Sequence, residues 1–475
     1  MTANIAIHLD RQARQSLVEQ ITAEIRNAIA AGRLLPGARL PSWHDLAAQL
    51  GVARGTVRAA YERLGDEQLV GSAGAAGTYV TARPAPRLIS HQEALRARAL
   101  PPILQGAGGE PNLFQLGVPA QDAFPAKTWS RLQVQAARQV GARAVGYPDP
   151  CGEAELRREI VASLTIARGI ACSPEQVFIT AGYAGALGLT LQTQQLKGAR
   201  CWMEDPGYLF ARRALELAGL QPVPIPVDEE GLDVAAGITL APEAEVALVT
   251  PGQQAPLGVT LSLPRRQALL DWAAQRGTWI IEDDYLGELQ LKGRAAPALA
   301  ALDRAGRVLH IGTFSKTINP ALRLGFLVVP EELASRFLES ASFLGPAPAS
   351  VAQLAVAAFL REGHYLRHLR RMKRIYGERR QQLSTCLTAQ GVHHRLAGLS
   401  VLRHLPPDCD DAALARMARQ QGLYPMPLSP WFARPESAHR GLLLGVTNVP
   451  PERAADCCER LDALVRLSSN LAEPR

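Results

Sequence analysis

Lys316 and the acidic motif WIIEDDY at 279–285 are the two features whose residue types and spacing most directly indicate chemistry. The chain has 46 arginines but only five lysines, and Lys316 follows an apolar run in the motif GTFSKT. Asp283 lies 33 residues earlier, in WIIEDDY, at the end of another apolar run. A lysine amine forms an imine with an aldehyde after losing its proton in a cationic or partly desolvated pocket. Either motif alone is weak evidence for a reactive site, because polar residues at the end of a strand are commonly just exposed to solvent.

These motifs lie in a region, residues 112–475, where apolar runs alternate with helical stretches. The runs are VFIT, ALVT, WIIEDDY, VLHIGTF and RLGFLVV. Such alternation predicts an α/β fold with a mostly parallel central sheet that helices cover on both faces. From about residue 350 a long basic helical stretch precedes short strands and a final helix. We therefore expect a small C-terminal α+β lobe over about 350–475.

Residues 1–82 follow a different pattern, which predicts a separate small unit. The apolar positions of its first helix are Leu17, Ile21, Ile25 and Ile29. The expected elements are this helix, ending at Gly32, two more helices at about 42–50 and 54–64, and strands at 69–70 and 78–80. Their order predicts a winged helix-turn-helix. Residues 83–111, rich in Pro, Gly and Ala, predict a linker.

Length, composition and charge narrow the class of protein. A chain of 475 residues is too long for one ordinary domain, and 47% hydrophobic with 20% charged residues is typical of soluble globular proteins. The seven cysteines and the histidines at 364, 368, 393 and 394 lack ligand spacing, so we expect reduced thiols and no metal site. No long apolar run or signal peptide is visible, which predicts a cytoplasmic protein without a membrane segment. The net charge of +7 permits an acidic partner without indicating one.

The first unit resembles the winged helix-turn-helix of GntR-family regulators over residues 14–82. The likeness rests on the turn Leu-Gly-Val at 50–52, the Arg-x-Thr-Val start of the next helix at 54–57, and the wing Gly-Thr-Tyr at 77–79. It implies a double-stranded DNA operator as partner. Arginine near the start of a helix in the major groove can bind guanine or phosphate. The predicted DNA-binding residues are Ser42, His44, Arg54, Thr56 and Arg58.

This unit departs from the GntR pattern at three points. His44 stands where the family often has arginine, Ala53 where a serine usually caps the recognition helix, and the wing lacks its usual arginine. A missing cap costs about 0.5 to 2 kcal/mol. Fewer phosphate contacts weaken binding and lower its salt dependence. We therefore expect that two such units in a dimer are needed for useful affinity.

Six motifs in residues 112–475 resemble, in order, those of fold-type I, aspartate-aminotransferase-like proteins. They are GYPDPCGEAELR, ITAGYAGAL, EDPGY, TPGQQAPLG, IIEDDY and GTFSKT. With the winged helix in front, the whole chain resembles the MocR/GabR subfamily of transcription regulators. The resemblance implies an aminotransferase-like domain with pyridoxal 5'-phosphate as cofactor.

The resemblance also implies which residues hold the cofactor ring. Lys316 would be the catalytic residue that forms the imine, and Asp283 would keep the pyridine nitrogen protonated so that the ring withdraws electrons. Tyr285 would donate to the ring oxygen, and Tyr208 would stack on the ring. These four residues define the predicted ring site.

The phosphate group needs donors at the other end of the cofactor. By resemblance these are Gly182, Tyr183, Ala184, Thr313 and Arg323. The first three open a helix, where backbone N–H groups and the helix dipole favour anions. Tyr147 would reach the phosphate from the partner subunit. The resemblance therefore implies a homodimer with shared sites.

Two departures bear on catalysis. Family aminotransferases usually have asparagine before Pro-x-Gly, where this chain has Ala255, and an arginine that clamps the substrate carboxylate, where it has Leu443. Leucine cannot make the bidentate contact of arginine. Arg212 and Arg440 are candidate substitutes for binding an effector. An ordinary amino-acid aminotransferase is therefore disfavoured, and at most slow half-reactions are expected.

The sequence thus predicts a homodimeric regulator that senses pyridoxal phosphate, or a small amine through its aldimine. Sensing requires that the ligand favour one arrangement of the two DNA-binding units. An aminotransferase that carries a DNA-binding head is the alternative. A third hypothesis is a sensor of pyridoxal phosphate alone that controls vitamin B6 synthesis.

Overall fold

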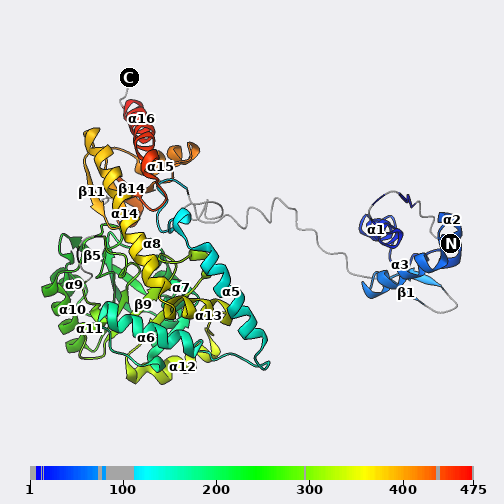
Figure 1. Ribbon diagram of the computed structural model, residues 1–475, viewed down its shortest axis with the longest axis horizontal. Helices are drawn as coiled ribbons and strands as arrows, with labels where there is room; N and C mark the ends of the chain where they lie inside the picture. The colour runs from blue at the N-terminus through cyan, green and yellow to red at the C-terminus, as the bar shows by residue number, and fades with distance from the viewer. Residues whose placement is uncertain are drawn as a thin grey trace. The chain divides into compact units, whose positions relative to one another are not determined.

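A computed structural model describes residues 7–72, 77–81, 112–434 and 439–472, apart from positions 12, 14, 292, 294 and 295. The chain divides into two compact units, Met1–Gly108 and Gly109–Arg475, which are described separately (Figure 1). The predicted linker, 83–111, and the tip of the predicted wing, 73–76, lie outside the described residues.

The N-terminal unit is the predicted winged helix-turn-helix. Its elements are α1 (Leu17–Ala30), α2 (Trp43–Leu50), α3 (Arg54–Asp66) and the antiparallel strands β1 (Val70–Ser72) and β2 (Thr78–Val80). Ser16 starts α1 through a capping box with Glu19. The predicted stripe is buried where Ile21 and Ile25 pack against α3. The unit therefore has a hydrophobic core of its own. Because the helices bury one face in that core, the spacing of their apolar residues was enough to predict the unit.

The large unit is built on a mixed, mostly parallel sheet of eight strands in the order β3-β10-β9-β8-β7-β4-β5-β6. The strands are β3 (Val177–Thr180), β4 (Arg200–Asp205), β5 (Gln221–Asp228), β6 (Gly231–Leu232), β7 (Val246–Val249), β8 (Trp279–Asp283), β9 (Val308–Thr313) and β10 (Gly325–Val328). Strand β10 runs antiparallel to both of its neighbours, and β6 is antiparallel to β5. The predicted mostly parallel sheet is confirmed, and among the predicted runs RLGFLVV is the antiparallel one.

Helices cover both faces of this sheet (Figure 1). Along β3, Val177 and Ile179 pack in one hydrophobic cluster with α5, α6 and α13, while Phe178 packs in another with α7 and α12. This alternation follows from the two-residue period of a strand. The covering helices are α5 (Ala126–Gly141), α6 (Ala154–Arg168), α7 (Gly182–Gln194), α8 (Leu209–Leu217), α9 (Val234–Leu240), α10 (Leu263–Arg276), α11 (Leu299–Leu302), α12 (Ala334–Phe343) and α13 (Ser350–Arg361).

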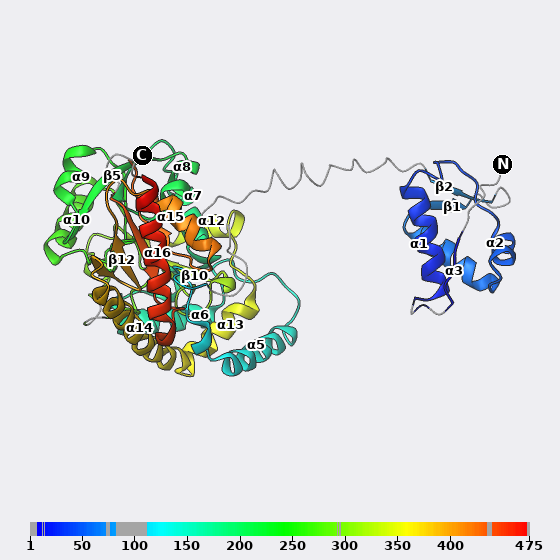
Figure 2. The ribbon, with the colours of Figure 1, turned by 90° about the horizontal axis from the view of Figure 1, so that it is seen from above.

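The C-terminal part forms a second, four-stranded antiparallel sheet in the order β11-β12-β14-β13. Its elements are α14 (His364–Ala389), β11 (His394–Ala397), β12 (Ser400–His404), α15 (Asp411–Gln420), β13 (Met426–Pro427), β14 (Gly441–Gly445) and α16 (Ala454–Ala472). Short 3-10 turns are η3 (Gln121–Ala123), η4 (Pro174–Gln176), η5 (Pro320–Leu322), η6 (Glu331–Leu333), η7 (Ser429–Trp431) and η9 (Pro451–Arg453). Figure 2 shows α14 and α16 beside this sheet, and the two helices pack against each other.

The small lobe differs from the predicted range in two respects. Helix α13, which the predicted range of 350–475 includes, packs against α5 and α6 of the large sheet. In the other direction, Leu113 and Phe114 bridge to Leu423 and Gly445, so a segment from the start of the large unit belongs with the small sheet. Neither difference could be read from periodicity, which does not say which layer an apolar helix covers.

Three further features concern the described residues only. None of their helices combines the length and apolar character that a membrane crossing requires. No group of three or more His, Cys, Asp or Glu side chains within them is placed to hold a metal ion. All seven cysteines are free.

Candidate cofactor and DNA-binding sites

Lys316 lies just beyond the carboxyl end of β9, with its amine against a backbone carbonyl of a distant segment. Its Nζ donates to the carbonyl oxygen of Gly117 at 3.0 Å. Gly117 has φ +76°, and a Cβ there would lie 2.6 Å from Nζ, so this position requires glycine. Burial lowers the pKa of Lys316, against the attraction of Asp283. A lowered pKa increases the fraction of neutral, nucleophilic amine.

Asp283 ends β8, the parallel neighbour of β9, so its carboxylate and Lys316 belong to the same edge of the sheet. Its Oδ1 is buried and accepts no hydrogen bond from any described residue. Burial, with the nearby charges of Asp284 and Glu204, raises the pKa of Asp283 well above its usual range. A protonated ring nitrogen at Oδ1 would provide the missing partner, which is the fit expected for pyridoxal phosphate.

Arg323, one of the predicted phosphate residues, lies at the start of α7, where Gly182, Tyr183 and Ala184 begin the helix. Arg323, in the left-handed region at φ +48°, donates from Nη2 to Ala181 O at 3.3 Å, and a Cβ on Gly182 would lie 3.7 Å from its guanidinium. Ala181, the N-cap, provides no side-chain hydrogen bond to the helix. The first N–H groups of α7 therefore remain available to an anion. Thr313 is close in sequence to Lys316, and its Oγ1 accepts from Ser315 N at 3.2 Å.

Three tyrosines of the predicted cofactor site, Tyr183, Tyr208 and Tyr285, lie near Asp283. The Tyr183 hydroxyl is buried without a partner among the described residues, and its ring lies 5.8 Å from that of Tyr208. Burial raises the pKa of Tyr208 to about 12, and it raises those of Tyr183 and Tyr285 as well, with Asp283 adding to all three. These hydroxyls are therefore donors at neutral pH.

The exposed face of α3 carries the predicted DNA contacts. Arg54 and Arg58 are exposed, and Thr56 is partly buried. Arg58 Nε bonds to Glu62 at 2.9 Å, so Arg54 is the arginine with no such intrahelical pairing. Ala53 is the N-cap without a side-chain bond, as the sequence predicted.

Helix α2 places the other two predicted residues. Ser42 caps the helix, because its Oγ accepts from Asp45 N at 3.1 Å and donates to Asp45 Oδ2 at 2.7 Å. His44 is exposed, and its ring lies 3.9 Å from that of Trp43. The structure thus gives Ser42 a structural task in addition to its predicted place near DNA.

Arg39 is a candidate DNA contact that the motifs did not indicate. It bridges to Tyr79 of the wing, and its guanidinium lies beside Gly77, where a Cβ would come within 3.0 Å of Nε. The wing therefore has an arginine next to it, although its own strands have none. The charge comes from a neighbouring segment, so a motif comparison of the wing could not find it.

Comparisons with known proteins agree with both units. The pattern of the family "Aminotransferase class I and II" matches residues 120–440, and that of "Bacterial regulatory proteins, gntR family" matches residues 17–80. A protein of Rhizobium meliloti described as "Probable rhizopine catabolism regulatory protein MocR" is 34% identical over 487 residues, which cover 98% of this chain and 97% of that protein.

The chain belongs to the MocR family of transcription regulators. A second relative, the pyridoxine biosynthesis transcriptional regulator PdxR of Corynebacterium glutamicum, is 34% identical over 383 residues, 80% of this chain and 81% of that one. LysN, the α-aminoadipate aminotransferase of Thermus thermophilus, matches with a TM-score of 0.69 at 26% identity over 81% of this chain and 98% of LysN. This MocR-type protein is therefore a DNA-binding regulator that depends on pyridoxal phosphate.

Three further predicted residues are Tyr147, Arg212 and Arg440. Tyr147 is fully exposed, at 104% of its reference area. Arg212 of α8 donates to the carbonyl oxygen of Pro430 at 2.9 Å, and Arg440 lies 3.9 Å from Asp411. Both arginines of this MocR-type chain are thus engaged by the small lobe.

The two positions that depart from the aminotransferase pattern lie together. Ala255 and Leu443 belong to one buried group, which we call the apolar cluster: Ala255, Ala397, Leu402, Leu428, Trp431 and Leu443. Tyr208 and Tyr285 of the predicted ring site pack against it. The substitutions in this MocR-type regulator therefore change one continuous surface beside the cofactor residues.

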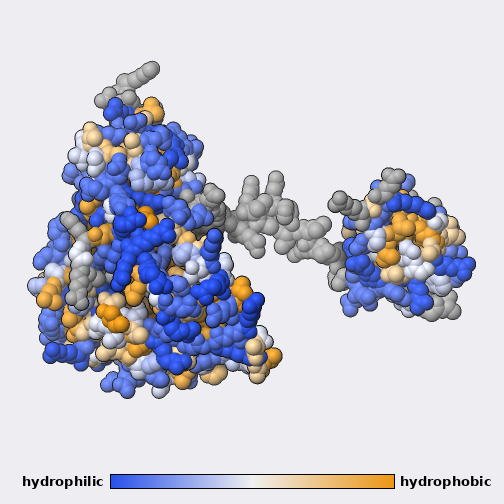
Figure 3. Space-filling view, viewed as in Figure 1, coloured by the Kyte–Doolittle hydropathy of each residue, from blue (hydrophilic) through white to orange (hydrophobic). Residues whose placement is uncertain are grey.

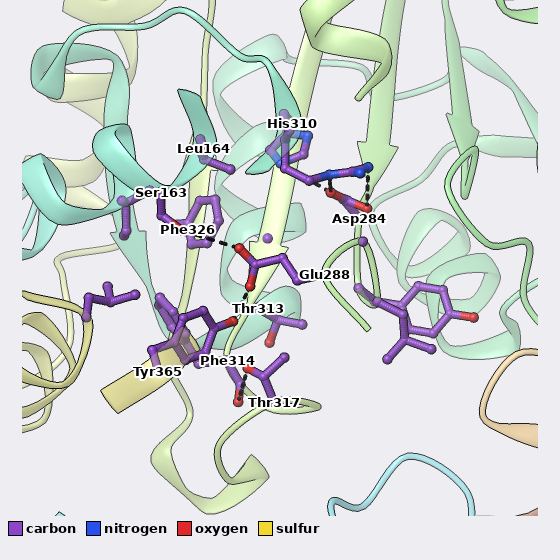
Figure 4. A pocket seen from close by; sticks show the side chains of 17 residues that line it. Ser163, Leu164, Asp284, Glu288, His310, Thr313, Phe314, Thr317, Phe326 and Tyr365 are labelled. Carbon is purple, nitrogen blue, oxygen red and sulfur yellow. Dashed lines mark hydrogen bonds and ion pairs between the residues drawn. The ribbon is translucent and has the colours of Figure 1, made fainter. Parts of the chain in front are cut away.

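Asp284 and its neighbours line a small cavity of about 40 Å³, whose lining is mostly apolar (Figure 4). Arg168 holds Asp284 with Nε–Oδ2 at 2.7 Å and Nη2–Oδ1 at 3.2 Å. Glu288 accepts from Tyr365 and from Ser163, and burial raises its pKa. Because Asp284 is already paired, Asp283 is the carboxylate whose oxygen lacks a partner.

Proposed function

We propose that this MocR-type regulator is a cytoplasmic homodimer in which Lys316 bonds to pyridoxal phosphate, and that an effector at this site changes operator binding. The effector is either pyridoxal phosphate itself or a small amine. The observation that carries the proposal is the juxtaposition of Lys316 with Asp283, a buried carboxylate whose Oδ1 has no partner in the described chain. Such a carboxylate is costly unless a cation completes it.

Each residue of the site has one task in this proposal. Bound pyridoxal phosphate supplies an aldehyde that reacts with amines and a ring that withdraws electrons. Lys316 provides the neutral amine, and Asp283 holds the proton on the ring nitrogen. Arg323 and the start of α7 bind the phosphate. The name of the relative PdxR refers to pyridoxine biosynthesis, which supports the cofactor itself as one candidate effector.

Dimer formation would explain an exposed apolar loop. The loop after α5 carries Val145 and Tyr147, whose side chains are fully exposed, and Figure 3 shows hydrophobic surface at its tip. Exposed apolar residues of this kind are typical of interfaces. In the proposed dimer, Tyr147 lies at the phosphate of the partner's site. The dimer also carries two DNA-binding units, which we expect useful operator affinity to require because α3 lacks a side-chain cap.

Arg54→Ala is expected to weaken operator binding without altering the absorbance of the bound cofactor. A bidentate base contact is worth about 1 to 3 kcal/mol, whereas loss of a phosphate contact lowers the salt slope by about one unit. Fluorescence anisotropy with labelled operator over a salt series separates the two. Arg33→Ala, an exposed arginine after α1, is the matched control. Equal affinities for Arg54→Ala, the control and the unmodified chain would remove Arg54 from the interface.

Asp283→Asn is expected to raise the dissociation constant of pyridoxal phosphate at least about tenfold, because asparagine cannot carry the charge that pairs with the ring nitrogen. Any cofactor-dependent change in operator affinity should then shift to correspondingly higher cofactor concentration. Both are measured in one titration, by cofactor absorbance and by operator anisotropy. Asp271→Asn, an exposed carboxylate on α10, is the control. Cofactor affinity unchanged in Asp283→Asn would disprove the assigned role.

A further inference from the structure

The apolar cluster lies beside the amine of Lys316. Leu443 is wholly buried on β14, opposite Leu402 of β12. Leu116 packs against the cluster and directly precedes Gly117, whose carbonyl accepts from Lys316 Nζ. Together with Tyr208 and Tyr285, this contact brings the cluster next to the place where an amine would meet the cofactor.

Most arginines close to the cluster already have partners. Arg212 donates to the carbonyl groups of Pro430 and Trp431. Arg395 is paired with Glu229 at 3.0 Å and donates to Leu257 O, while its buried Nε has no partner among the described residues. To pair with one of these arginines, an effector carboxylate would have to displace the contacts that the arginine already makes. A carboxylate that paired with no cation would lose its hydrating water and gain no other partner.

Arg380 is the strongest competitor for a carboxylate. It is half-buried on α14 and donates to the carbonyl oxygen of Gly398, next to Ala397 of the cluster. Burial lowers the pKa of Arg380. A carboxylate at the cluster would therefore have to use this residue, or compete for Arg212, Arg395 or Arg440 with the contacts that they already make.

The cluster contains one buried polar group without a hydrogen-bond partner among the described residues, and this group is uncharged. Trp431 Nε1 is buried and meets no acceptor in the part of the chain that the structure describes. An indole N–H can donate to a hydroxyl or ether oxygen, but it does not compensate a full negative charge.

We infer that the effector is a primary amine without a carboxylate, whose apolar body packs against the cluster of Ala255, Leu402, Trp431 and Leu443. This inference rests on the proposed function and specifies its ligand class. With pyridoxal phosphate bound, Lys316 would give up its bond to the aldehyde carbon as the incoming amine bonds there, and the released lysine amine would take up the proton that the incoming amine loses. Each buried methylene should add about fourfold to affinity, until the space beside the cluster is filled.

The test compares 3-methylbutylamine with L-leucine, which share one carbon skeleton and differ by the carboxylate. Both are titrated into the full-length, cofactor-loaded dimer with operator DNA. Cofactor absorbance and operator anisotropy are recorded, and concentrations are corrected to the unprotonated amine. We expect the amine to bind at least about tenfold more tightly, with affinity rising from propylamine to pentylamine.

Leu443→Arg is expected to reverse this preference, since it restores a bidentate cation where the family's aminotransferases have one. Ile238→Arg adds the same charge on the exposed surface of α9 and should leave the preference unchanged. If Leu443→Arg does not bind the cofactor, Leu443→Gln takes its place and should weaken binding of the amine several-fold without improving that of leucine.

The outcomes separate the inference from the proposed function. Leucine binding as tightly as the amine, with Arg380→Met abolishing it, overturns the inference and makes Arg380 the carboxylate ligand. Failure of both compounds to perturb a cofactor that is bonded to Lys316 also overturns it, and leaves pyridoxal phosphate as the effector. A chain in which Lys316 does not bond to the cofactor contradicts the proposed function itself.

Discussion

Lys316→Ala is expected to abolish covalent attachment of pyridoxal phosphate while the dimer stays folded. Among the described residues the side chain makes one hydrogen bond, to Gly117 O, and the phosphate contacts predicted at Arg323 and the start of α7 do not involve it. The variant should therefore still bind the cofactor, more weakly and reversibly. Borohydride reduction followed by peptide mass spectrometry measures the loss directly, and visible absorbance follows it in solution.

Lys197→Ala is the matched control for this experiment. Lys197 is an exposed lysine after α7, so its replacement removes the same charge without touching the site. The control should retain full attachment at Lys316. A reducible cofactor adduct that persists in Lys316→Ala would show that another amine performs the chemistry, and the assignment would then be abandoned.

Arg168→Met is expected to destabilise the large unit by about 3 to 5 kcal/mol, because it leaves the buried charge of Asp284 without its partner. The side chains are 1% and 6% exposed, and the pairing is bidentate. Arg168 also donates to Ala296 O at 2.7 Å, which the variant loses as well. Urea unfolding in a Trp43→Phe background measures the change, since the other five tryptophans all lie in the large unit.

A double variant separates the charge from the packing. Adding Asp284→Asn to Arg168→Met removes the unpaired charge and should recover at least half of the lost stability at the same protein concentration. Arg213→Met, which breaks the exposed pair with Glu216, should cost less than about 1 kcal/mol. Strictly additive losses in the double variant would show that Asp284 is not held as a charge by Arg168.

Much of the fold could be predicted because the spacing of apolar residues along each segment indicates its secondary structure. The four-residue stripe of α1 and the apolar runs β3, β7, β8 and β9 have the periods of their elements. Parallel strands align their carboxyl ends, so residues at the ends of β8 and β9 had to share one edge of the sheet. That geometry agrees with the pairing of Asp283 and Lys316, which the resemblance to aminotransferase-like proteins implied, and their roles remain predictions.

The remaining contacts depend on residues that carry no local signal. Gly117 contributes a carbonyl oxygen across 199 positions, and a backbone atom looks the same at every residue. Arg168 and Asp284 are 116 positions apart, and nothing in the sequence separates Asp284 from Asp283. The pairing of Ala255 with Leu443 was likewise visible only as two separate departures, because their contact requires the docking of the small sheet.

The hydrogen bond between Lys316 and Gly117 joins the reacting nitrogen to the first described segment after residue 111. That segment is tied to the small sheet through Leu113 and Phe114, and in the sequence it continues back toward the winged helix. An ammonium group has three N–H donors, and a nitrogen bonded to another carbon has fewer. A bond from the Lys316 nitrogen to another carbon would therefore leave fewer N–H groups to hold Gly117 O, and the segment that carries Leu113 and Phe114 would be tied less firmly to the end of β9.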